Sequence, residues 1–252
     1  MKTLSRTLAL LLMVGMLGTG LAMAEPAGAA RYDNDINARA GQELNKKPAF
    51  RNLQASAEDG IVTLTGSVDL YQQKLDAAKK VRKLSKVQGV RNLIEVSSSA
   101  PDAKLEAQLN RKLFYDRIGY DNVFNYVTVS VNNGVATLIG EVKEPVSRDS
   151  AFAIASSVSG VKEVVDNIKV LPVSTFDDRI RRQAARAIYG NSVLSRYATD
   201  PALPIRIVVD NGKLILYGTV ESKMDKQMAG VKANGVFGVF SVQNNLVVAN
   251  QS

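Results

Sequence analysis

The sequence of 252 residues contains no cysteine and no histidine. Without cysteine, the protein forms no disulfide and offers no thiolate as a nucleophile or metal ligand. Without histidine, it lacks the usual general base near neutral pH, the usual partner of a nucleophilic serine and the commonest transition-metal ligand. These two absences exclude most hydrolytic mechanisms, and we expect neither a metal site nor a cofactor.

Long hydrophobic runs are also scarce, because the only one lies at the N-terminus. Residues 8–21 are mostly apolar, Lys2 and Arg6 precede them, and Ala22-Met23-Ala24 follows as a small-x-small cleavage pattern. This pattern is typical of a secretory signal peptide. It predicts a cleaved signal over residues 1–24, although an uncleaved anchor remains an alternative. No paired arginine or following cysteine indicates another route or a lipid anchor. The exported product is therefore expected in the periplasm.

The rest of the chain is dominated by a threefold internal repeat. Residues 59–96, 133–170 and 211–248 align without a gap. With the segments that precede them, they predict three modules at residues 31–97, 102–171 and 176–249. Modules of about 70 residues lie near the lower limit for an independently stable core, so contacts between modules are expected. A function is better sought in a repeated surface than in a unique cleft.

The repeat places few carboxylates where catalysis would need them. Two acidic side chains suffice for glycoside hydrolysis in principle. However, Asp59 aligns with Asn133 and Asn211, and the other acids are scattered over expected helix surfaces. The sequence therefore predicts a protein without enzymatic activity.

Each module begins with apolar residues four positions apart, which predict one face of a helix. Acidic residues stand where the helix starts, as N-cap or first-turn acids. The apolar series are Ile36-Ala40-Leu44, Leu105-Leu109-Leu113 and Ile180-Ala184-Ile188, and the acids are Asp33 or Asp35, Asp102 and Asp177.

Two strands, a second helix and a last strand follow. The two strands alternate apolar and polar residues and meet at Asx-Gly turns at Gly60, Gly134 and Gly212. We expect a second glycine in each copy, at Gly66, Gly140 and Gly218, to face inward and let the second helix approach the sheet. The predicted fold class is α+β: three small αββαβ sandwiches, each with two helices on one face of a three-stranded sheet.

These residues resemble the BON-domain family of exported bacterial proteins. The resemblance rests on GIVTLTGSV from Gly60, GVATLIGEV from Gly134 and GKLILYGTV from Gly212, and on Gly160-Val161 with Asn167 and Gly238-Val239 with Asn245. The first copy departs from the pattern, with Lys86 at the glycine position and Leu93 at the asparagine position, so its turn is expected to differ. The resemblance implies the αββαβ fold. It also implies attachment to phospholipid membrane surfaces, or a periplasmic stress and chaperone role, without catalysis.

The chain carries an excess of positive charge, formally +8, which favours acidic partners. Two clusters are candidate contacts to an anionic surface, although the alternative, that both are solvated helix faces opposite an apolar stripe, is the favoured interpretation. They are Arg179, Arg181, Arg182 and Arg186, and Lys79, Lys80, Arg82, Lys83 and Lys86. A cation also recurs eight residues after each strand glycine, at Lys74, Arg148 and Lys226. Its role is either a shared contact or coverage of the helix start by an aliphatic stem.

Aromatic residues gather at Phe114, Tyr115, Tyr120, Phe124 and Tyr126, and at Phe237 and Phe240. They serve either as membrane-interface anchors or as core and inter-module contacts. Nucleic acid is not expected as a partner, given the export signal and the lack of a recognition motif. We hypothesise an exported adaptor on an anionic phospholipid surface of the envelope, with avidity from three modules. The competing hypothesis is a soluble periplasmic chaperone or an adaptor for envelope proteins. The oligomeric state is left open.

Overall fold

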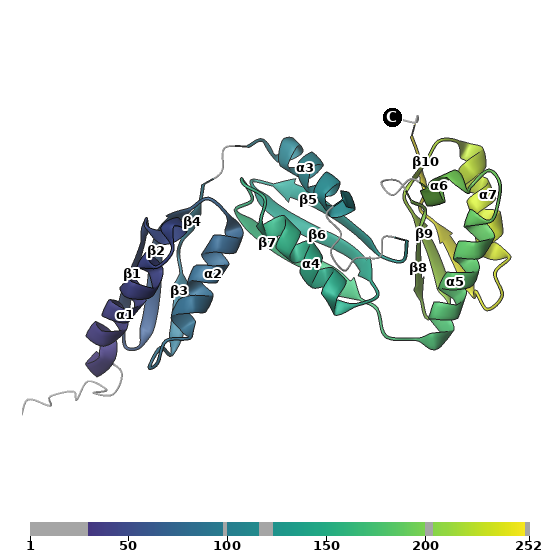
Figure 1. Ribbon diagram of the computed structural model, residues 1–252. Coiled ribbons are helices and arrows are strands. Elements are labelled where there is room, and N and C mark those ends of the chain that lie inside the picture. Colours follow the sequence, from purple (N-terminus) through teal and green to yellow (C-terminus); the bar gives the residue numbers. More distant parts are fainter. Residues whose placement is uncertain (1–29, 98–99, 116–122, 200–203, 250–252) are drawn as a thin grey trace, which may run out of the picture.

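A computed structural model describes residues 30–97, 100–115, 123–199 and 204–249 (Figure 1). The predicted signal peptide, and Tyr120 of the aromatic group, lie outside the described residues. Three helix-and-sheet units follow one another along the chain, which confirms the predicted α+β class.

Module 1 opens with a short 3-10 turn, Ala30–Tyr32, and helix α1 (Asp33–Asn45). A second 3-10 turn, Pro48–Phe50, leads into strand β1 (Leu53–Glu58). The remaining elements are β2 (Ile61–Val68), α2 (Tyr71–Arg82), β3 (Gly89–Asn92) and β4 (Glu95–Val96). The central strand β2 pairs antiparallel with β1 and parallel with β3 and β4.

Module 2 repeats this order with a longer, unbroken last strand. Its elements are α3 (Asp102–Tyr115), β5 (Tyr126–Asn132), β6 (Val135–Val142), α4 (Pro145–Ser156) and β7 (Glu163–Val170). The sheet order is β5-β6-β7, antiparallel and then parallel.

Module 3 contains the same elements and one additional short helix. They are α5 (Thr175–Tyr189), α6 (Arg196–Thr199), β8 (Arg206–Asp210), β9 (Lys213–Tyr217), β10 (Thr219–Val220), α7 (Lys223–Asn234), β11 (Ser241–Asn244) and β12 (Val247–Val248). β9 lies between β8 and β11, and β10 pairs with β12. The extra helix α6 fills the connection between α5 and β8, which the repeat pattern did not predict.

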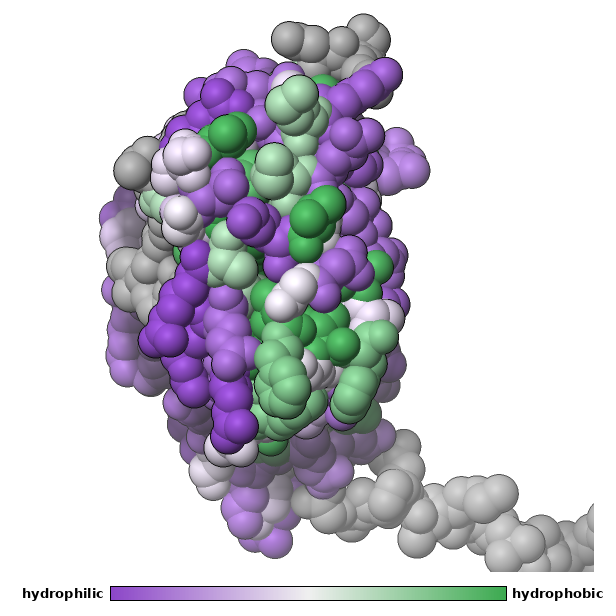
Figure 2. All heavy atoms as spheres, turned by 90° about the vertical axis from the view of Figure 1, so that its right-hand side faces the viewer, coloured by the Kyte–Doolittle hydropathy of each residue, from purple (hydrophilic) through white to green (hydrophobic). Residues whose placement is uncertain are grey.

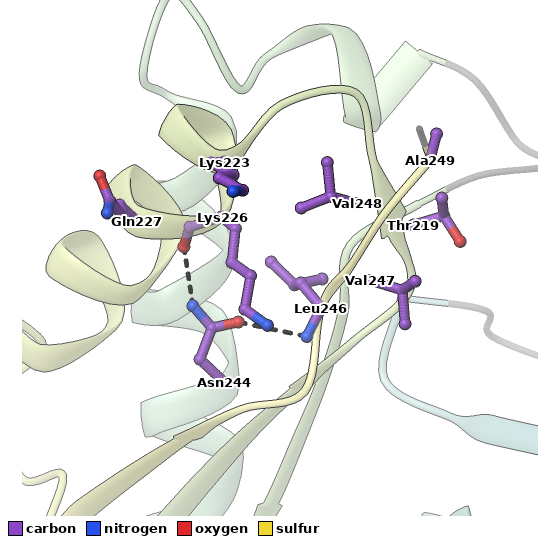
Figure 3. A pocket seen from close by; sticks show the side chains of 9 residues that line it. All are labelled: Thr219, Lys223, Lys226, Gln227, Asn244, Leu246, Val247, Val248 and Ala249. Atoms are coloured by element: carbon purple, nitrogen blue, oxygen red, sulfur yellow. Dashed lines mark hydrogen bonds between the residues drawn. The ribbon is translucent and has the colours of Figure 1, made fainter. Parts of the chain in front are cut away.

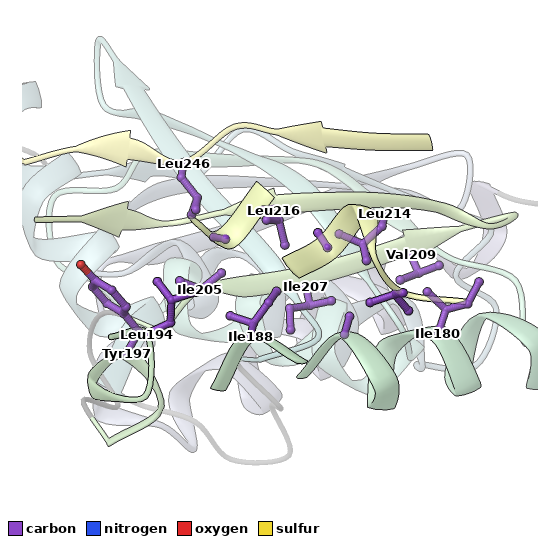
Figure 4. Close-up of a cluster of buried hydrophobic side chains, with 14 of the residues drawn as sticks. Ile180, Ile188, Leu194, Tyr197, Ile205, Ile207, Val209, Leu214, Leu216 and Leu246 are labelled. Carbon is purple, nitrogen blue, oxygen red and sulfur yellow. The ribbon is translucent and has the colours of Figure 1, made fainter. Parts of the chain in front are cut away.

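Each module has its own hydrophobic core between its two helices and one face of its sheet. In module 3, Ile180 and Ile188 on α5 point toward Ile207 on β8 and Leu216 on β9 (Figure 4). The residues four positions apart are buried in all three first helices, as their spacing predicted: Ile36, Ala40, Leu44, Leu105, Leu109, Leu113, Ile180, Ala184 and Ile188. Burial of this stripe is what makes short helices stable in water.

The strand glycines are required for a different reason from the one predicted. A Cβ on Gly140 would lie 2.0 Å from the carbonyl oxygen of Tyr126, on the paired strand β5. A Cβ on Gly66 would lie 2.1 Å from the carbonyl oxygen of Asn52, the residue just before β1. The expectation that these glycines face the second helix is therefore wrong, since the close neighbour is the backbone of the adjacent strand. The eight glycines that the sequence analysis placed in the turns and strands of the repeat all adopt positive φ: Gly60, Gly66, Gly134, Gly140, Gly160, Gly212, Gly218 and Gly238.

The turn at Lys86 does not differ from its counterparts, contrary to the expectation from sequence. Lys86 adopts φ 71°, close to the 96° of Gly160 and the 88° of Gly238. A side chain with a Cβ therefore occupies a left-handed conformation that costs about 1–2 kcal/mol. The Lys86 ammonium lies 5.1 Å from the centre of the Tyr32 ring, a contact that offsets part of this cost.

An aspartate carboxylate joins the first helix to the hairpin turn in every module, and in module 3 this carboxylate is buried. Asp177 accepts hydrogen bonds from the backbone N–H groups of Asn211 and Gly212, at 3.1 and 2.8 Å. Asp33 binds the turn of module 1 at 2.9 and 3.0 Å, and Asp102 binds the turn of module 2 at 2.7 and 2.9 Å. These first-turn acids therefore hold the hairpin as well as the helix.

Modules 2 and 3 share an extensive interface. The rings of Tyr126 and Tyr217 stack with centroids 3.9 Å apart and planes 2° apart. Beside them, Leu171 packs with Val208 and Ile215, which lie on the face of the third sheet that its own helices leave open. The backbone N–H of Ile207 donates to the carbonyl of Val123 at 2.6 Å. The expected contact between modules is present here.

Modules 1 and 2 meet over a smaller area. Tyr71, the first residue of α2, packs edge-to-face against Phe152 on α4, with ring centroids 6.5 Å apart. Burial raises the pKa of the Tyr71 hydroxyl, the negative charge of Glu163 adds to this, and a hydrogen bond with the Val164 backbone opposes it. The junction between the first two modules thus rests mainly on one aromatic pair.

Candidate binding surfaces

The basic residues predicted on the first module follow α2 and the turn after it. Lys79, Arg82, Lys83 and Lys86 are exposed, and Lys80 is partly buried. They lie on the outer side of a helix whose Ala77 and Val81 are fully buried. The helix therefore presents a cationic outer face, as expected for either interpretation of this cluster.

The second cluster, on α5, is smaller than predicted. Arg179, Arg182 and Arg186 are exposed and share one stripe of the helix. Arg181 does not belong with them, because only 3% of it is exposed. Its guanidinium donates to the Asp178 carboxylate at 2.7 Å and to the carbonyl of Val209. Arg181 is therefore a structural residue that ties α5 to β8.

Exposed aromatic side chains lie next to the start of α5. Phe237 and Phe240 are 85% and 78% exposed, and Phe176 is 41% exposed. The rings of Phe176 and Phe240 stack at 5.9 Å. We call these three residues the aromatic cap of module 3. Figure 2 shows a hydrophobic patch, rimmed by hydrophilic side chains, on the end of the molecule that this module forms.

The aromatic cap has no counterpart in the other two modules. In the aligned repeats, Ser85 and Ser159 stand where Phe237 stands, and Gln88 and Lys162 stand where Phe240 stands. All three residues at the last position cover the glycine of the hairpin turn, since a Cβ there would touch Gln88, Lys162 or Phe240. The cap therefore adds exposed apolar surface to a turn that folds without it.

The other aromatic residues separate into two groups. Tyr126 lies in the interface with module 3, and the Arg206 guanidinium lies 4.5 Å from the centre of the Phe114 ring. Phe124 packs against the core of module 3, whereas Tyr115 is 59% exposed. Burial raises the pKa of Tyr217 to about 12, and the negative charge of Glu141 adds to this shift. Most of the module 2 aromatics are thus inter-module contacts.

The cation that recurs in the second helix has one setting in module 2 and another in modules 1 and 3. In module 2, the Arg148 guanidinium donates to the Asp166 carboxylate at 2.7 Å. In modules 1 and 3 the residue opposite is an asparagine, whose amide donates to the backbone carbonyl of Lys74 or Lys226. The recurrence therefore reflects a shared position without a shared side-chain contact.

Lys226 borders an open groove of about 750 Å³ between α7 and the end of the third sheet (Figure 3). Lys223 and Gln227 also come from α7, and the apolar side is formed by Leu246 and Val248. The sequence analysis marked Lys226 as a recurring cation but did not predict this groove, because its residues are brought together only by the fold.

A charged cluster holds α6 against the first turn of α7. The buried Asp225 carboxylate accepts hydrogen bonds from Tyr197 at 2.7 Å and from Arg196 at 2.5 Å. Burial favours the neutral form of Asp225, but the hydrogen bonds from Tyr197 and Arg196 outweigh it and lower the pKa of the carboxyl. Arg196 also pairs with Glu221 at 2.9 Å.

Two further properties of the described residues bear on function. None of their helices is long and apolar enough to cross a membrane. Nor do they bring together three acidic side chains in a way that would hold a metal ion.

Charge is unevenly distributed along the sequence, with 12 basic and 8 acidic residues in module 1, 8 and 9 in module 2, and 10 and 6 in module 3.

Repeated αββαβ units, two of which carry an exposed cationic helix face, define a protein of tandem α+β modules. The model of the BON domain matches this chain three times, at residues 32–98, 101–172 and 177–250. The chain belongs to the BON-domain family, as the sequence resemblance indicated.

Individual relatives share less than a third of their aligned residues with this chain. The chain is 26% identical over 155 residues to osmotically-inducible protein Y of Escherichia coli, covering 60% of this chain and 72% of the relative. It is 29% identical to outer membrane lipoprotein DolP of Haemophilus influenzae, covering 44% of this chain and 58% of the relative. A solved structure of CdsD, a structural protein of the type III secretion system of Chlamydia trachomatis, aligns over 85% of this chain and 92% of that chain. Its identity is 15% and its TM-score is 0.23, too low to indicate a shared arrangement.

Proposed function

We propose that the protein is exported, has no enzymatic activity and binds the anionic phospholipid surface of an envelope membrane through its BON modules. In this proposal residues 1–24 are removed as a signal peptide, and the product serves envelope maintenance or stress protection in the periplasm. The names of two relatives, an osmotically inducible protein and an outer membrane lipoprotein, are consistent with this setting.

The observation that carries the proposal is the aromatic cap beside the arginine stripe of α5. Phenylalanine rings that are 85% and 78% exposed cost free energy in water but are stabilised at the apolar boundary of a bilayer. Arg179 lies one helical turn after Phe176, so cationic and aromatic groups reach the same surface. Each arginine near an anionic surface contributes about 1 kcal/mol.

The cationic face of α2 supplies a second contact on the same chain. Modules 1 and 3 carry the net positive charge, whereas module 2 does not. Two weak contacts on one chain gain avidity, provided that both reach the surface together. Module 1 thus raises the affinity, and module 3 supplies the apolar insertion.

Co-flotation with vesicles tests the proposal, using the chain without residues 1–24 and anionic or neutral phospholipid at low and high salt. We expect binding to anionic vesicles that weakens with salt, because the lysine and arginine contacts are screened. Replacing Arg179, Arg182 and Arg186 with glutamine should weaken binding on the order of 10- to 100-fold. Replacing Lys104, Arg111 and Lys162 of module 2 removes the same charge and should change little.

The cap is tested separately by Phe237→Ser with Phe240→Gln, which introduces the residues that module 1 carries at these positions. The charge is unchanged and the turn already folds with these residues, so a loss of flotation reports the loss of apolar insertion. Equal binding to anionic and neutral vesicles, or no flotation under any condition, contradicts the proposal.

A chaperone or protein adaptor is the second candidate, and the open face of the module 2 sheet favours it. Ile139 on β6 and Val165 on β7 lie on this face and are 47% and 36% exposed. An exposed sheet face of this kind suits an apolar protein client. Suppression of client aggregation that is insensitive to salt and is lost in Ile139→Thr with Val165→Thr would support this candidate instead.

A further inference from the structure

The groove between α7 and the end of the third sheet combines cationic and apolar surface. Lys226 and Lys223 line it from α7, and Leu246 and Val248 form its apolar side (Figure 3). Among the described residues, neither lysine forms an ion pair with a carboxylate. Two uncompensated cations over an apolar wall match an anionic group attached to a hydrocarbon chain.

The internal repeat shows what these cations lack. In module 3 the groove carries neutral polar residues at three positions, Thr219, Gln227 and Asn244. The aligned positions of module 2 are all acidic: Glu141, Asp149 and Asp166. In that module Asp166 neutralises Arg148, the counterpart of Lys226, across 2.7 Å. The third module therefore keeps the cation of this arrangement and replaces its carboxylate.

Asn244 also shows why the missing carboxylate is tolerated by the fold. Its amide donates to the carbonyl of Lys226 at 2.7 Å, and its oxygen accepts from the backbone N–H of Leu246 at 3.2 Å. Asp166 accepts from Ile168 in the same way, at 3.0 Å. The side-chain oxygen thus fixes the strand in both modules, while only the aspartate neutralises the neighbouring cation.

The same end of the sheet is covered in the two preceding modules. Tyr71, the counterpart of Lys223 in module 1, packs against Phe152 of module 2. Leu171, the counterpart of Ala249 in module 2, packs against the sheet of module 3. In module 3 the corresponding residues, Lys223 and Ala249, line the groove instead.

We propose that this groove binds one monoacyl carboxylate, with the head group between Lys223 and Lys226 and the acyl chain along Leu246 and Val248. A carboxylate is the group that the repeat itself places beside this cation in module 2. The site takes a single amphiphile molecule in solution, so it is independent of the aromatic cap and of any membrane surface.

Isothermal titration of the chain without residues 1–24 tests the proposal with decanoate, kept at concentrations where it is monomeric. Acetate supplies the head group alone, and octanol supplies a chain without charge. We expect decanoate to bind at least tenfold more tightly than either, with the largest amide NMR shifts at Lys226, Asn244 and Val248. Equal binding of octanol would overturn the proposal.

Asn244→Asp is the sharpest variant, because it introduces the residue that module 2 carries and keeps the oxygen that binds the strand. It should weaken decanoate binding at least tenfold, and Lys226→Gln should do the same. Lys213→Gln, which removes an exposed lysine outside the groove, should leave binding unchanged. Flotation on vesicles should be the same for Asn244→Asp and for the unmodified chain, which separates this site from the proposed membrane contact.

Three further results would contradict the proposal. Decanoate binding that is unaffected by Asn244→Asp places the ligand elsewhere. A sedimentation coefficient of the ligand-free chain that falls in the groove variants identifies the groove as a contact between copies. Tighter binding of an acidic peptide than of decanoate assigns the groove to a protein partner.

Discussion

At the scale of single residues, the glycines distinguish backbone constraint from free space. Gly140 has φ 147° and lies against the Tyr126 carbonyl, so an alanine there must displace strand β5. Gly41 lies inside α1, and a Cβ at that position would meet no atom within 4 Å. The two positions therefore predict opposite effects of the same substitution.

We expect Gly140→Ala to lower the free energy of unfolding of module 2 by about 2–4 kcal/mol, through strain and displaced strand pairing. Gly41→Ala should raise that of module 1 by about 0.5–1 kcal/mol, because alanine is the better helix former. Native-state hydrogen exchange of amides on β6 and β2 reports each module separately. A neutral Gly140→Ala would contradict the close approach of β5.

Lys86 offers a second test at this scale, since it occupies a turn conformation that glycine occupies in the other modules. Lys86→Gly removes the left-handed strain and also removes the cation–π contact with Tyr32. We expect a net gain of about 0.5–1 kcal/mol for module 1, because an exposed cation–π contact is the smaller of the two effects. Lys83→Gly, at the C-cap of α2 where φ is an ordinary −80°, should instead destabilise the module. Hydrogen exchange of the β2 amides measures both.

The first-turn aspartates show where residue-level prediction stopped. Their position at the helix start was predictable, because the acid precedes the apolar stripe in each copy. Their contact with the hairpin was not predictable, because the length of chain between the aspartate and the turn glycine varies. The separation along the sequence is 27 residues in module 1, 32 in module 2 and 35 in module 3. A pairing at variable separation leaves no periodic signal.

At the scale of elements, the repeat predicted the helix and strand order of all three modules, because every copy alternates periods of four and two in the same sequence of steps. It did not predict α6, which fills a connection present only in module 3. This element is held by polar contacts to Asp225, and such contacts have no hydrophobic periodicity. The groove was missed for a related reason, since three substitutions of acid by neutral residues are visible only once the fold brings them together.

The Asp225 cluster predicts a dependence of module 3 stability on pH. Its folded-state pKa lies below the ordinary value, so the ionised form is favoured by folding. The resulting stabilisation is present above the carboxyl pKa of the unfolded chain and is lost as pH falls through the lowered folded value. We therefore expect module 3 to weaken on acidification in this range, measured by hydrogen exchange of α6 and α7 amides.

Asp225→Asn should remove most of this acid dependence and lower the stability at neutral pH, since Arg196 then loses the buried one of its two carboxylate partners. Asp149→Asn, at an exposed position on α4, serves as the control and should alter neither. An acid dependence that persists in Asp225→Asn would assign it to other carboxylates.

At the scale of the whole molecule, the two junctions differ in strength. Modules 2 and 3 share stacked tyrosines, an apolar cluster, a backbone hydrogen bond and the Lys143–Asp178 ion pair at 3.4 Å. Modules 1 and 2 meet mainly through Tyr71 and Phe152. We infer that modules 2 and 3 move as one body, whereas module 1 has more freedom to reorient. The distance between the cationic face of α2 and the arginine stripe of α5 then changes as the junction between modules 1 and 2 bends.

The interface between modules 2 and 3 is tested by Tyr126→Ala, which removes one ring of the stacked pair. Stacking and burial of this ring contribute about 2–3 kcal/mol to the coupling of the two modules. We expect NMR relaxation to show a common rotational correlation time for modules 2 and 3 in the unmodified chain, and separate, shorter times in the variant. Tyr115→Ala, which removes a tyrosine that is 59% exposed, should leave the common time unchanged. Separate tumbling in the unmodified chain would contradict a rigid pair, and the proposed membrane contact of module 3 would then be independent of module 2.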